Sequence, residues 1–388
     1  MAITRLYPPP IKLKSQPVCK FWLMGRCKYG PKCRFLHPED QSPATMIKEV
    51  IPSMAATEKE PPKKVTIKKK MPPTVKIKEP LKEPYLGPFS NLTNLQGHKK
   101  DITGIVLPMG SDKLYTASRD GTMRIWNCNT GECVAVWNLG GEIGCLISEG
   151  TWIFASLPNL IKAWNVVDGK EEPICLKHSL GQVNAMEADG DLLFSGTQEG
   201  SVLAWRGSFE ANPFKLVASL KGHSKLVLCL TTGAGRLYSG SMDHTVRVWD
   251  PKNFGCLHVL KEHRGYVTSL LCWQSFLLTS SLDKTIKAWA LNDGGRMEVI
   301  HSRSEEDGIV ELKGMGDSEG QPVLLCALKD SSVRVYQLPS FVEKGRISSS
   351  KEVKSMKTGP GDLFFTGDGT GTLAVWKWTV EQPSKAAA

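Results

Sequence analysis

Residues 237–250 read LYSGSMDHTVRVWD, and their pattern indicates the fold of the larger part of the chain. Residues 237–241 have the composition of a short strand, and residues 245–249 alternate apolar and polar side chains like a second strand. Between them stands Asp243, a residue type that favours tight turns because its side chain can hydrogen-bond the backbone two residues on. The stretch therefore predicts two short antiparallel strands joined by a turn.

The same pattern recurs along the chain from residue 87 onward. Two close copies are LYTASRDGTMRIWN at 114–127 and LLTSSLDKTIKAWA at 277–290. Weaker copies end at Trp164, Trp205, Tyr336 and Trp376. Successive end points lie 38, 41, 44, 40, 47 and 40 residues apart, so a unit of about forty residues occurs seven times. One such unit cannot bury its strands alone, and stacked units must therefore cover one another.

The three strongest copies share a His before the first strand, a Ser or Thr in the second, a turn Asp and a closing Trp. These units resemble WD repeats, and residues 87–380 accordingly resemble an all-β, seven-bladed WD-repeat β-propeller. The resemblance implies that the four side chains form a buried hydrogen-bond relay within each blade. The implied relay residues are His98, Thr116, Asp120 and Trp126; His223, Ser239, Asp243 and Trp249; and His263, Thr279, Asp283 and Trp289.

The other four units keep only part of this set. The second lacks both His and Asp, whereas His178 and Ser195 of the third fit the pattern. In the third, Glu199 stands in place of the turn Asp. The sixth has Asp330 but no His, with Cys326 for the hydroxyl and Tyr336 for the Trp, and in the seventh Asp368 is displaced by two residues. Because the His, hydroxyl and Asp sets recur in register with the repeat, a structural role explains them better than catalysis.

Residues 90–97, SNLTNLQG, read as a strand with no earlier repeat to join. The last repeat, in turn, leaves little chain after Trp378 for an outer strand. We therefore expect the N-terminal strand to complete the seventh blade and close the ring. The eight cysteines of residues 87–380 have no metal-ligand spacing, and we expect them to be small buried side chains.

A second motif lies upstream, CKFWLMGRCKYGPKCRFLH at 19–37, with the spacing C-x7-C-x5-C-x3-H. Thiolate and imidazole are the ligands of structural zinc sites, and four of them close a tetrahedron. A segment this short has no core, so metal binding must supply its folding energy, on the order of 10 kcal/mol. The sequence predicts one structural zinc ion held by Cys19, Cys27, Cys33 and His37.

Residues 15–40 resemble the CCCH zinc finger family, whose typical function is to bind single-stranded RNA and, in some members, DNA. Aromatic faces suit base stacking, and cationic side chains suit phosphates. The candidate contacts are Lys20, Phe21, Arg26, Lys28, Tyr29, Lys32, Arg34 and Phe35. A module of this size also needs aromatics to shield its metal. Trp22 and Phe35 are the candidates for that role, which leaves Phe21 and Tyr29 as the better stacking residues.

Charge divides the chain into unequal parts. Residues 1–86 hold 18 Lys and Arg against 7 Asp and Glu, whereas the remainder is nearly neutral. We expect disordered ends at 1–14 and 381–388 and a disordered Pro- and Lys-rich linker at 41–86. Its run of five lysines, 63–70, suits nuclear import or phosphate contact, with a solvated spacer as the alternative.

The whole arrangement resembles the plant zinc-finger-CCCH and WD-repeat proteins. This implies a zinc-dependent protein that binds RNA, or alternatively DNA, through its finger and basic linker, with a protein or peptide on the propeller. A substrate receptor or assembly platform, for example for a ubiquitin ligase, is the alternative. We expect the protein to be a monomer located in the nucleus, or alternatively in both nucleus and cytoplasm. We expect neither a signal peptide nor a membrane helix. The sequence has neither a phosphate-binding loop nor a metal site left open for water, so nothing in it indicates an enzyme.

Overall fold

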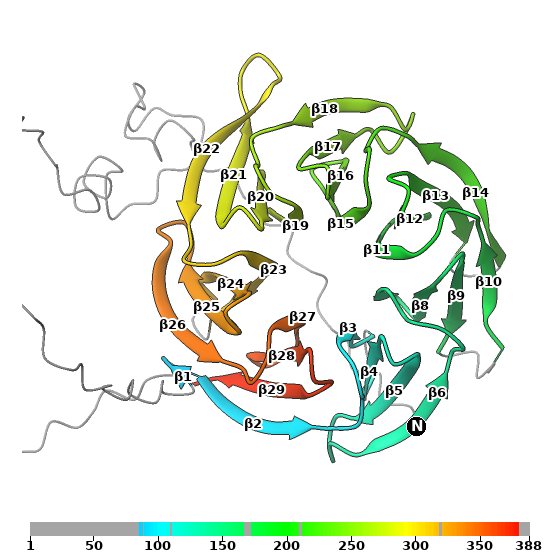
Figure 1. Cartoon of the computed structure of the whole chain (residues 1–388), viewed down its shortest axis with the longest axis vertical. Helices are drawn as coiled ribbons and strands as arrows, with labels where there is room; N and C mark the ends of the chain where they lie inside the picture. Colours follow the sequence, from blue (N-terminus) through cyan, green and yellow to red (C-terminus); the bar gives the residue numbers. More distant parts are fainter. Residues whose placement is uncertain are drawn as a thin grey trace, which may run out of the picture. The chain divides into compact units, whose positions relative to one another are not determined.

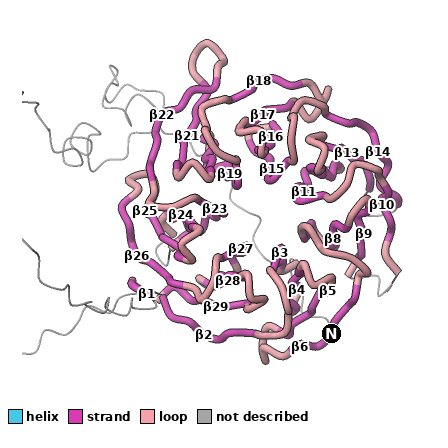
Figure 2. Tube along the Cα trace, in the orientation of Figure 1, coloured by secondary structure: helices cyan, strands magenta, loops and turns pink. Residues whose placement is uncertain are grey.

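Seven antiparallel sheets stand side by side around a central axis, each with one strand near the axis and one at the rim (Figure 1). The structure is a computed structural model that describes residues 85–87, 89–108, 111–166, 172–208, 212–317 and 320–379. Figure 2 shows strands and loops throughout these ranges, with no helix in them that could cross a membrane. The predicted all-β, seven-bladed propeller is confirmed. The predicted finger, the linker up to residue 84 and the C-terminal tail lie outside the described residues.

The strands of each blade run in order from the axis outward. Blade 1 contains β3 (Ile102–Val106), β4 (Lys113–Ser118), β5 (Thr122–Asn127) and β6 (Cys133–Asn138). Blade 2 contains β7 (Leu146–Glu149), β8 (Trp152–Leu157), β9 (Leu160–Asn165) and β10 (Ile174–Lys177). Blade 3 contains β11 (Val183–Asp189), β12 (Leu192–Thr197), β13 (Val202–Ser208) and β14 (Asn212–Leu220). Blade 4 contains β15 (Val227–Gly233), β16 (Arg236–Ser241), β17 (Val246–Trp249) and β18 (Cys256–Leu260).

The remaining blades follow the same order. Blade 5 contains β19 (Val267–Trp273), β20 (Phe276–Ser281), β21 (Thr285–Leu291) and β22 (Met297–Ser304). Blade 6 contains β23 (Ile309–Gly316), β24 (Pro322–Leu328), β25 (Ser332–Gln337) and β26 (Val342–Ser348), with β1 (Tyr85–Leu86) added at its outer edge. Blade 7 contains β27 (Val353–Thr358), β28 (Leu363–Asp368), β29 (Leu373–Trp378) and β2 (Phe89–Leu95).

The opening stretch folds as its pattern predicts. Leu237 pairs with Trp249 and Gly240 with Val246 across the β16–β17 turn. Asp243 accepts the backbone N–H of Thr245, and His244 takes a left-handed φ of 69° between them. The same turn in blade 7 has Gly371, where an added Cβ would lie 2.4 Å from the carbonyl oxygen of His98.

The core lies between blades rather than within any one of them. Second strands are buried along almost their whole length because a neighbouring blade covers each face, as in β16 with Leu237 and Ser239 fully buried. Seven apolar clusters result, and one of them joins Trp126 of blade 1 to Phe365 and Leu373 of blade 7. Each blade is thus stable only beside its neighbours, as the repeat pattern implied.

Strand β2 closes the ring, as predicted. It pairs antiparallel with β29 from Phe89 opposite Trp378 to Leu95 opposite Leu373, so blade 7 combines strands from both ends of the described chain. Phe89 is 3% exposed and packs edge-on against Trp378, with ring centroids 5.0 Å apart.

Deleting residues 87–97 is expected to lower the Tm of the propeller by at least ~5 °C. The deletion removes a whole strand and a buried Phe, a loss of roughly 3 kcal/mol or more. Differential scanning calorimetry of the full chain would measure this. An eleven-residue deletion within the 41–84 linker is the control and should leave the Tm unchanged. Equal melting of the two deletions would contradict the closure.

Candidate functional site

The residues predicted to hold zinc and to contact nucleic acid, from Cys19 to His37, lie outside the described residues. Three thiolates and one imidazole remain a donor set that suits zinc in a closed tetrahedral site. Within the described ranges, no group of three or more His, Cys, Asp or Glu side chains could hold a metal ion. The polar sets that the structure does describe belong to the propeller.

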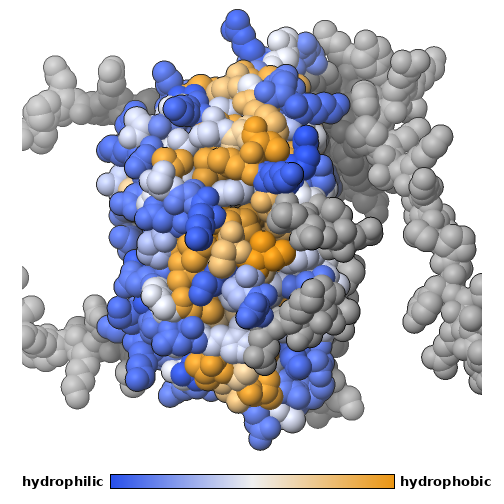
Figure 3. Space-filling view, turned by 90° about the vertical axis from the view of Figure 1, so that its right-hand side faces the viewer, coloured by the Kyte–Doolittle hydropathy of each residue, from blue (hydrophilic) through white to orange (hydrophobic). Residues whose placement is uncertain are grey.

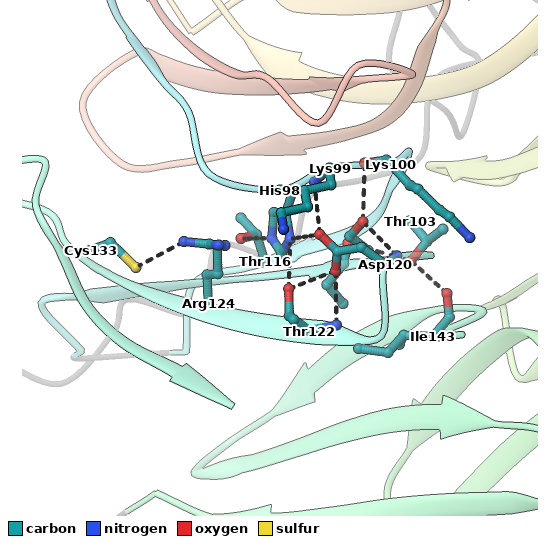
Figure 4. Close-up of polar contacts among 12 residues, drawn as sticks. His98, Lys99, Lys100, Thr103, Thr116, Asp120, Thr122, Arg124, Cys133 and Ile143 are labelled. Atoms are coloured by element: carbon teal, nitrogen blue, oxygen red, sulfur yellow. Dashed lines mark hydrogen bonds and ion pairs between the residues drawn. The ribbon is translucent and has the colours of Figure 1, made fainter. Parts of the chain in front are cut away.

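In blade 1 the predicted relay residues meet in one chain of hydrogen bonds, and Figure 4 shows the part formed by His98, Thr116 and Asp120. The indole N–H of Trp126 donates to Thr116 Oγ1 at 2.8 Å, and Thr116 Oγ1 lies 2.8 Å from His98 Nε2. On the other side of the ring, His98 Nδ1 lies 3.2 Å from Asp120 Oδ2. Asp120 also accepts the backbone N–H groups of Lys99 and Thr122, both at 2.8 Å.

The direction of the bonds fixes the proton positions. A carboxylate only accepts, so His98 Nδ1 carries the proton toward Asp120, and Nε2 accepts from the Thr116 hydroxyl. Burial lowers the pKa of His98 and keeps the ring neutral. Partial burial raises the pKa of Asp120, but hydrogen bonds from Thr122 and Lys99 outweigh it and bring that pKa to about 2. Every donor and acceptor of the relay is thus occupied by the fold, and no group is left to act on a substrate.

Blades 4 and 5 repeat this geometry. His223 Nδ1 lies 2.9 Å from Asp243 Oδ2, and His263 Nδ1 lies 2.9 Å from Asp283 Oδ2. The corresponding distances from His Nε2 are 2.8 Å to Ser239 Oγ and 2.7 Å to Thr279 Oγ1, and the indoles of Trp249 and Trp289 donate to the same hydroxyls.

The His position has a fixed place, four residues before the inner strand of the blade. His98, His223 and His263 all stand there relative to β3, β15 and β19. In blade 3, His178 stands five residues before β11, and its Nε2 is buried with no hydrogen-bond partner among the described residues. Ser195 still accepts from the Trp205 indole at 3.0 Å. His178 therefore matches the sequence pattern without joining a relay.

Blade 6 replaces the relay with a buried ionic cluster that sequence reasoning missed. Glu305 occupies the His position and is 8% exposed. Its carboxylate accepts from the Tyr336 hydroxyl at 2.8 Å, from Arg303 Nε at 2.7 Å and from Arg334 Nη1 at 3.3 Å. Burial and the Glu305 charge both raise the pKa of Tyr336. The available signal was Tyr336 itself, since a buried phenol needs a partner that Cys326 cannot supply.

Inner strands of neighbouring blades are tied by carboxylates. Glu187 of β11 accepts both the backbone N–H and the hydroxyl of Thr232 on β15, at 3.0 and 3.1 Å. Glu311 of β23 accepts the backbone N–H of Met356 on β27 and pairs with Lys313 at 3.2 Å. Burial raises the pKa of both carboxyl groups. These contacts join blades 3 to 4 and 6 to 7, which is a structural role.

A pocket of about 610 Å3 lies on the side of the propeller that carries the relay turns. Its walls come mainly from turns and loops of blades 1 to 4, and four of its nine lining residues carry an amide side chain. The lining residues are Arg119, Glu142, Pro158, Asn159, Gly181, Gln182, Asn184, Gln198 and Leu226. Groups of this kind suit hydrogen bonds to the backbone or polar side chains of a protein partner.

The expectation that the propeller cysteines are buried was wrong for half of them. Cys145 and Cys326 are buried, and Cys229 and Cys272 are partly so. The exposed ones are Cys128, Cys133, Cys175 and Cys256. Cys133, Cys175 and Cys256 lie in outer strands, whose rim face meets solvent, and Cys128 directly follows β5. In blades 1 and 4 the thiols of Cys133 and Cys256 lie within 3.8 Å of an arginine Nη1, of Arg124 and Arg247 respectively.

Replacing Asp243 with Ala is expected to lower the free energy of unfolding by about 1–3 kcal/mol, because buried donors of blade 4 lose their acceptor. Chemical denaturation of the full chain would measure this. Glu199→Ala is the matched control, since Glu199 holds the same turn position in blade 3 but is exposed and its blade lacks the relay. That change should cost less than about 0.5 kcal/mol. Equal effects would show that the relay adds no stability.

Comparisons with known proteins agree with both parts of the chain. The CCCH-type zinc finger family matches residues 17–38, and the WD domain, G-beta repeat family matches residues 89–127, 214–250 and 254–290.

Zinc finger CCCH domain-containing protein 17 of Oryza sativa subsp. japonica is 44% identical over 96% of this chain and 75% of its own length. Zinc finger CCCH domain-containing protein 48 of Arabidopsis thaliana is 44% identical over 95% of this chain and 75% of its own length. The WD40 β-propeller domain of Doa1 shares the fold alone, with a TM-score of 0.64, 18% identity and coverage of 78% of this chain and all of that one. The chain therefore belongs to the family of plant zinc finger CCCH domain-containing proteins that carry a WD-repeat propeller.

Proposed function

We propose that this protein binds single-stranded RNA through its zinc finger and holds a protein partner on its propeller. The observation that carries the proposal is the interleaving of four zinc ligands with aromatic and cationic side chains in residues 19–37. The family match to the finger supports zinc and, in general, nucleic acid. Within that class we choose RNA, because proteins recognise RNA sequences mostly in single-stranded segments, whose exposed bases stack on aromatic side chains.

Zinc would be held by Cys19, Cys27, Cys33 and His37 and would supply folding energy rather than chemistry. With all four positions taken by protein ligands, no site is left for an activated water. The His, hydroxyl and Asp groups of the propeller relay are likewise hydrogen-bonded within their own blades. We propose no reaction for this chain, in line with two families that are typical of scaffolds.

The basic arm would help the finger. Residues 1–86 carry a net charge of +11, and their lysines can neutralise phosphates wherever the finger binds. One finger alone offers few base contacts, so the arm and a partner on the propeller would both raise the affinity. The run of five lysines also supports nuclear import, and we propose the nucleus as the site of action.

Two surfaces of the propeller support a protein partner. One is the pocket lined by residues of blades 1 to 4, with four amide side chains in its walls. The other is the rim, where Figure 3 shows a band of apolar side chains along the outer strands. The exposed aliphatic residues of β6, β14 and β18 are Val134, Val136, Leu216, Val217, Leu257 and Val259.

An assembly platform with a protein-docking finger is the second candidate, favoured by these same propeller surfaces. For one large group of ubiquitin-ligase receptors the expected signature is Trp-Asp-x-Arg, but here Trp249-Asp250 is followed by Pro251 and Lys252. Salt separates the two functions, because RNA binding through several phosphates falls steeply with salt and a protein-docking finger need not show this.

Replacing Cys27 with Ser is expected to release zinc and abolish RNA binding while the propeller melts as before. The full chain would be assayed against random single-stranded RNA and DNA pools at two salt concentrations, with zinc content measured in parallel. Salt-sensitive binding of RNA that requires Cys27 supports the proposal. Binding that survives the change would assign the affinity to the lysine arm, and selection of DNA over RNA would reject the choice of RNA.

Replacing Tyr29 with Ala is expected to weaken RNA binding while zinc stays bound. Loss of one stacked base corresponds to about 1–3 kcal/mol, or roughly 5- to 150-fold in Kd. Trp22→Ala is the comparison, since that aromatic is expected to shield the metal and its loss should reduce zinc retention. An unchanged Kd for the Tyr29 variant would place that ring in the structural set instead.

A further inference from the structure

Blade 7 contains a pocket of about 310 Å3. The pocket lies between outer strand β2, strands β28 and β29, and the loop that leads from β26 to β27. Its lining residues are Asn91, Asn94, Ser348, Ser349, Ser350, Thr366, Asp368, Thr372, Ala374 and Trp376. None of these ten side chains carries a positive charge.

The pocket exists because two large side chains are missing from the repeat. The first is the imidazole, since the position four residues before β27 holds Ser349. The second is a long cationic side chain opposite the relay hydroxyl. Thr116 pairs with Arg124, Ser239 with Arg247 and Thr279 with Lys287, whereas Thr366 pairs with Ala374.

In blades 1 and 4 that arginine lies directly under the turn that carries the His. A Cβ added to Gly97 would lie 2.6 Å from Arg124 Nη1, and one added to Gly222 would lie 2.5 Å from Arg247 Nη1. The guanidinium of Arg247 also lies over the indole of Trp249, 5.9 Å from the ring centroid. The corresponding residue in blade 7 is Ala374, whose side chain ends at Cβ and cannot fill the same space.

The anionic half of the site is still present. Asp368 is 4% exposed, and its Oδ1 accepts from Thr370 Oγ1 at 2.6 Å and from the backbone N–H groups of Thr370 and Thr372. Its Oδ2 accepts from the hydroxyls of Ser350 and Ser349, at 3.1 and 3.5 Å. All of these donors are neutral. Among the ion pairs of the described residues, none includes Asp368, although a buried carboxylate is stabilised most by a cation.

We propose that this pocket binds the guanidinium group of an arginine side chain from a partner protein. A planar guanidinium can bond the Asp368 carboxylate and the Thr366 and serine hydroxyls together. Asn94 and Ser350 are exposed at the rim of the pocket, which gives the side chain a way in from solvent.

Blade 6 provides an internal precedent for this chemistry. There Arg303 and Arg334 bond the buried carboxylate of Glu305, and the Arg303 guanidinium lies 4.1 Å from the centroid of the Tyr336 ring. Buried carboxylate, aromatic face and guanidinium thus occur together in the adjacent blade. Blade 7 keeps a buried carboxylate but has no guanidinium beside it among the described residues, and a partner's arginine would supply one.

The test is binding of arginine probes to the full chain, measured by calorimetry and by the rise in Tm with ligand concentration. The probes are the pentapeptide Ala-Ala-Arg-Ala-Ala with blocked ends, the same peptide with citrulline, and agmatine as a free guanidino compound. The arginine peptide should raise the Tm, and the neutral citrulline peptide should not. Binding of agmatine with exclusion of the peptide would overturn the assignment to a partner protein.

Two variants and a control locate the site. Asp368→Asn should weaken binding about tenfold or more, because it removes the charge and keeps the shape. Ala374→Arg restores the side chain of blades 1 and 4, and this variant should stay folded and lose binding because the pocket is filled from within. Asp191→Asn removes an exposed carboxylate of blade 3 and should bind as the unchanged chain does. Unchanged binding by the Ala374→Arg variant, or no binding by the unchanged chain, would overturn the proposal.

Discussion

A buried indole N–H needs an acceptor, and the blades of this propeller are built around that need. In five of the seven blades the closing Trp donates to a hydroxyl ten residues earlier, as Trp126 does to Thr116 and Trp376 to Thr366. The bond fixes the register of the second and third strands of the blade. Because an unpaired indole in the core would cost free energy, the hydroxyl persists in blades 3 and 7, where the rest of the relay does not.

The other relay positions vary more freely, and the structure shows two outcomes when they change. In blade 6 a carboxylate replaces the imidazole, and the vacated positions are refilled by Tyr336 and two arginines around Glu305. In blade 7 the imidazole and the arginine are both replaced by small residues, and the space stays open around Asp368. The same geometric frame therefore gives either a closed ionic cluster or an open anionic pocket, depending on the size of two side chains.

Much of the fold was predictable because the same sequence pattern recurs in seven units along the chain. The forty-residue period predicted the blade count, and the unmatched strand before His98 indicated how the ring closes. Side chains that lie far apart in the sequence were harder to predict. Glu305 meets Arg334 and Tyr336 only because a loop and a third strand converge, and His178 misses its relay through a one-residue shift before β11. Exposed cysteines were missed because composition does not separate rim strands from buried ones.

The propeller and residues 19–37 differ in the chemistry that their side chains can offer a partner. The propeller has a core that can support a rigid surface, but the relay side chains of blades 1, 4 and 5 are hydrogen-bonded to one another inside it. Burial lowers the pKa of His98, Asp120 accepts hydrogen bonds on both oxygens, and the Thr116 hydroxyl accepts from the indole N–H. Residues 19–37 have the reverse character, with ligands, charges and aromatics but too few residues for a core. In the proposed function, the protein acts by joining what the finger binds to what the propeller holds. The incomplete blades differ, and the clearest instance is Asp368, a buried carboxylate whose hydrogen-bond donors are all neutral and which borders an open pocket.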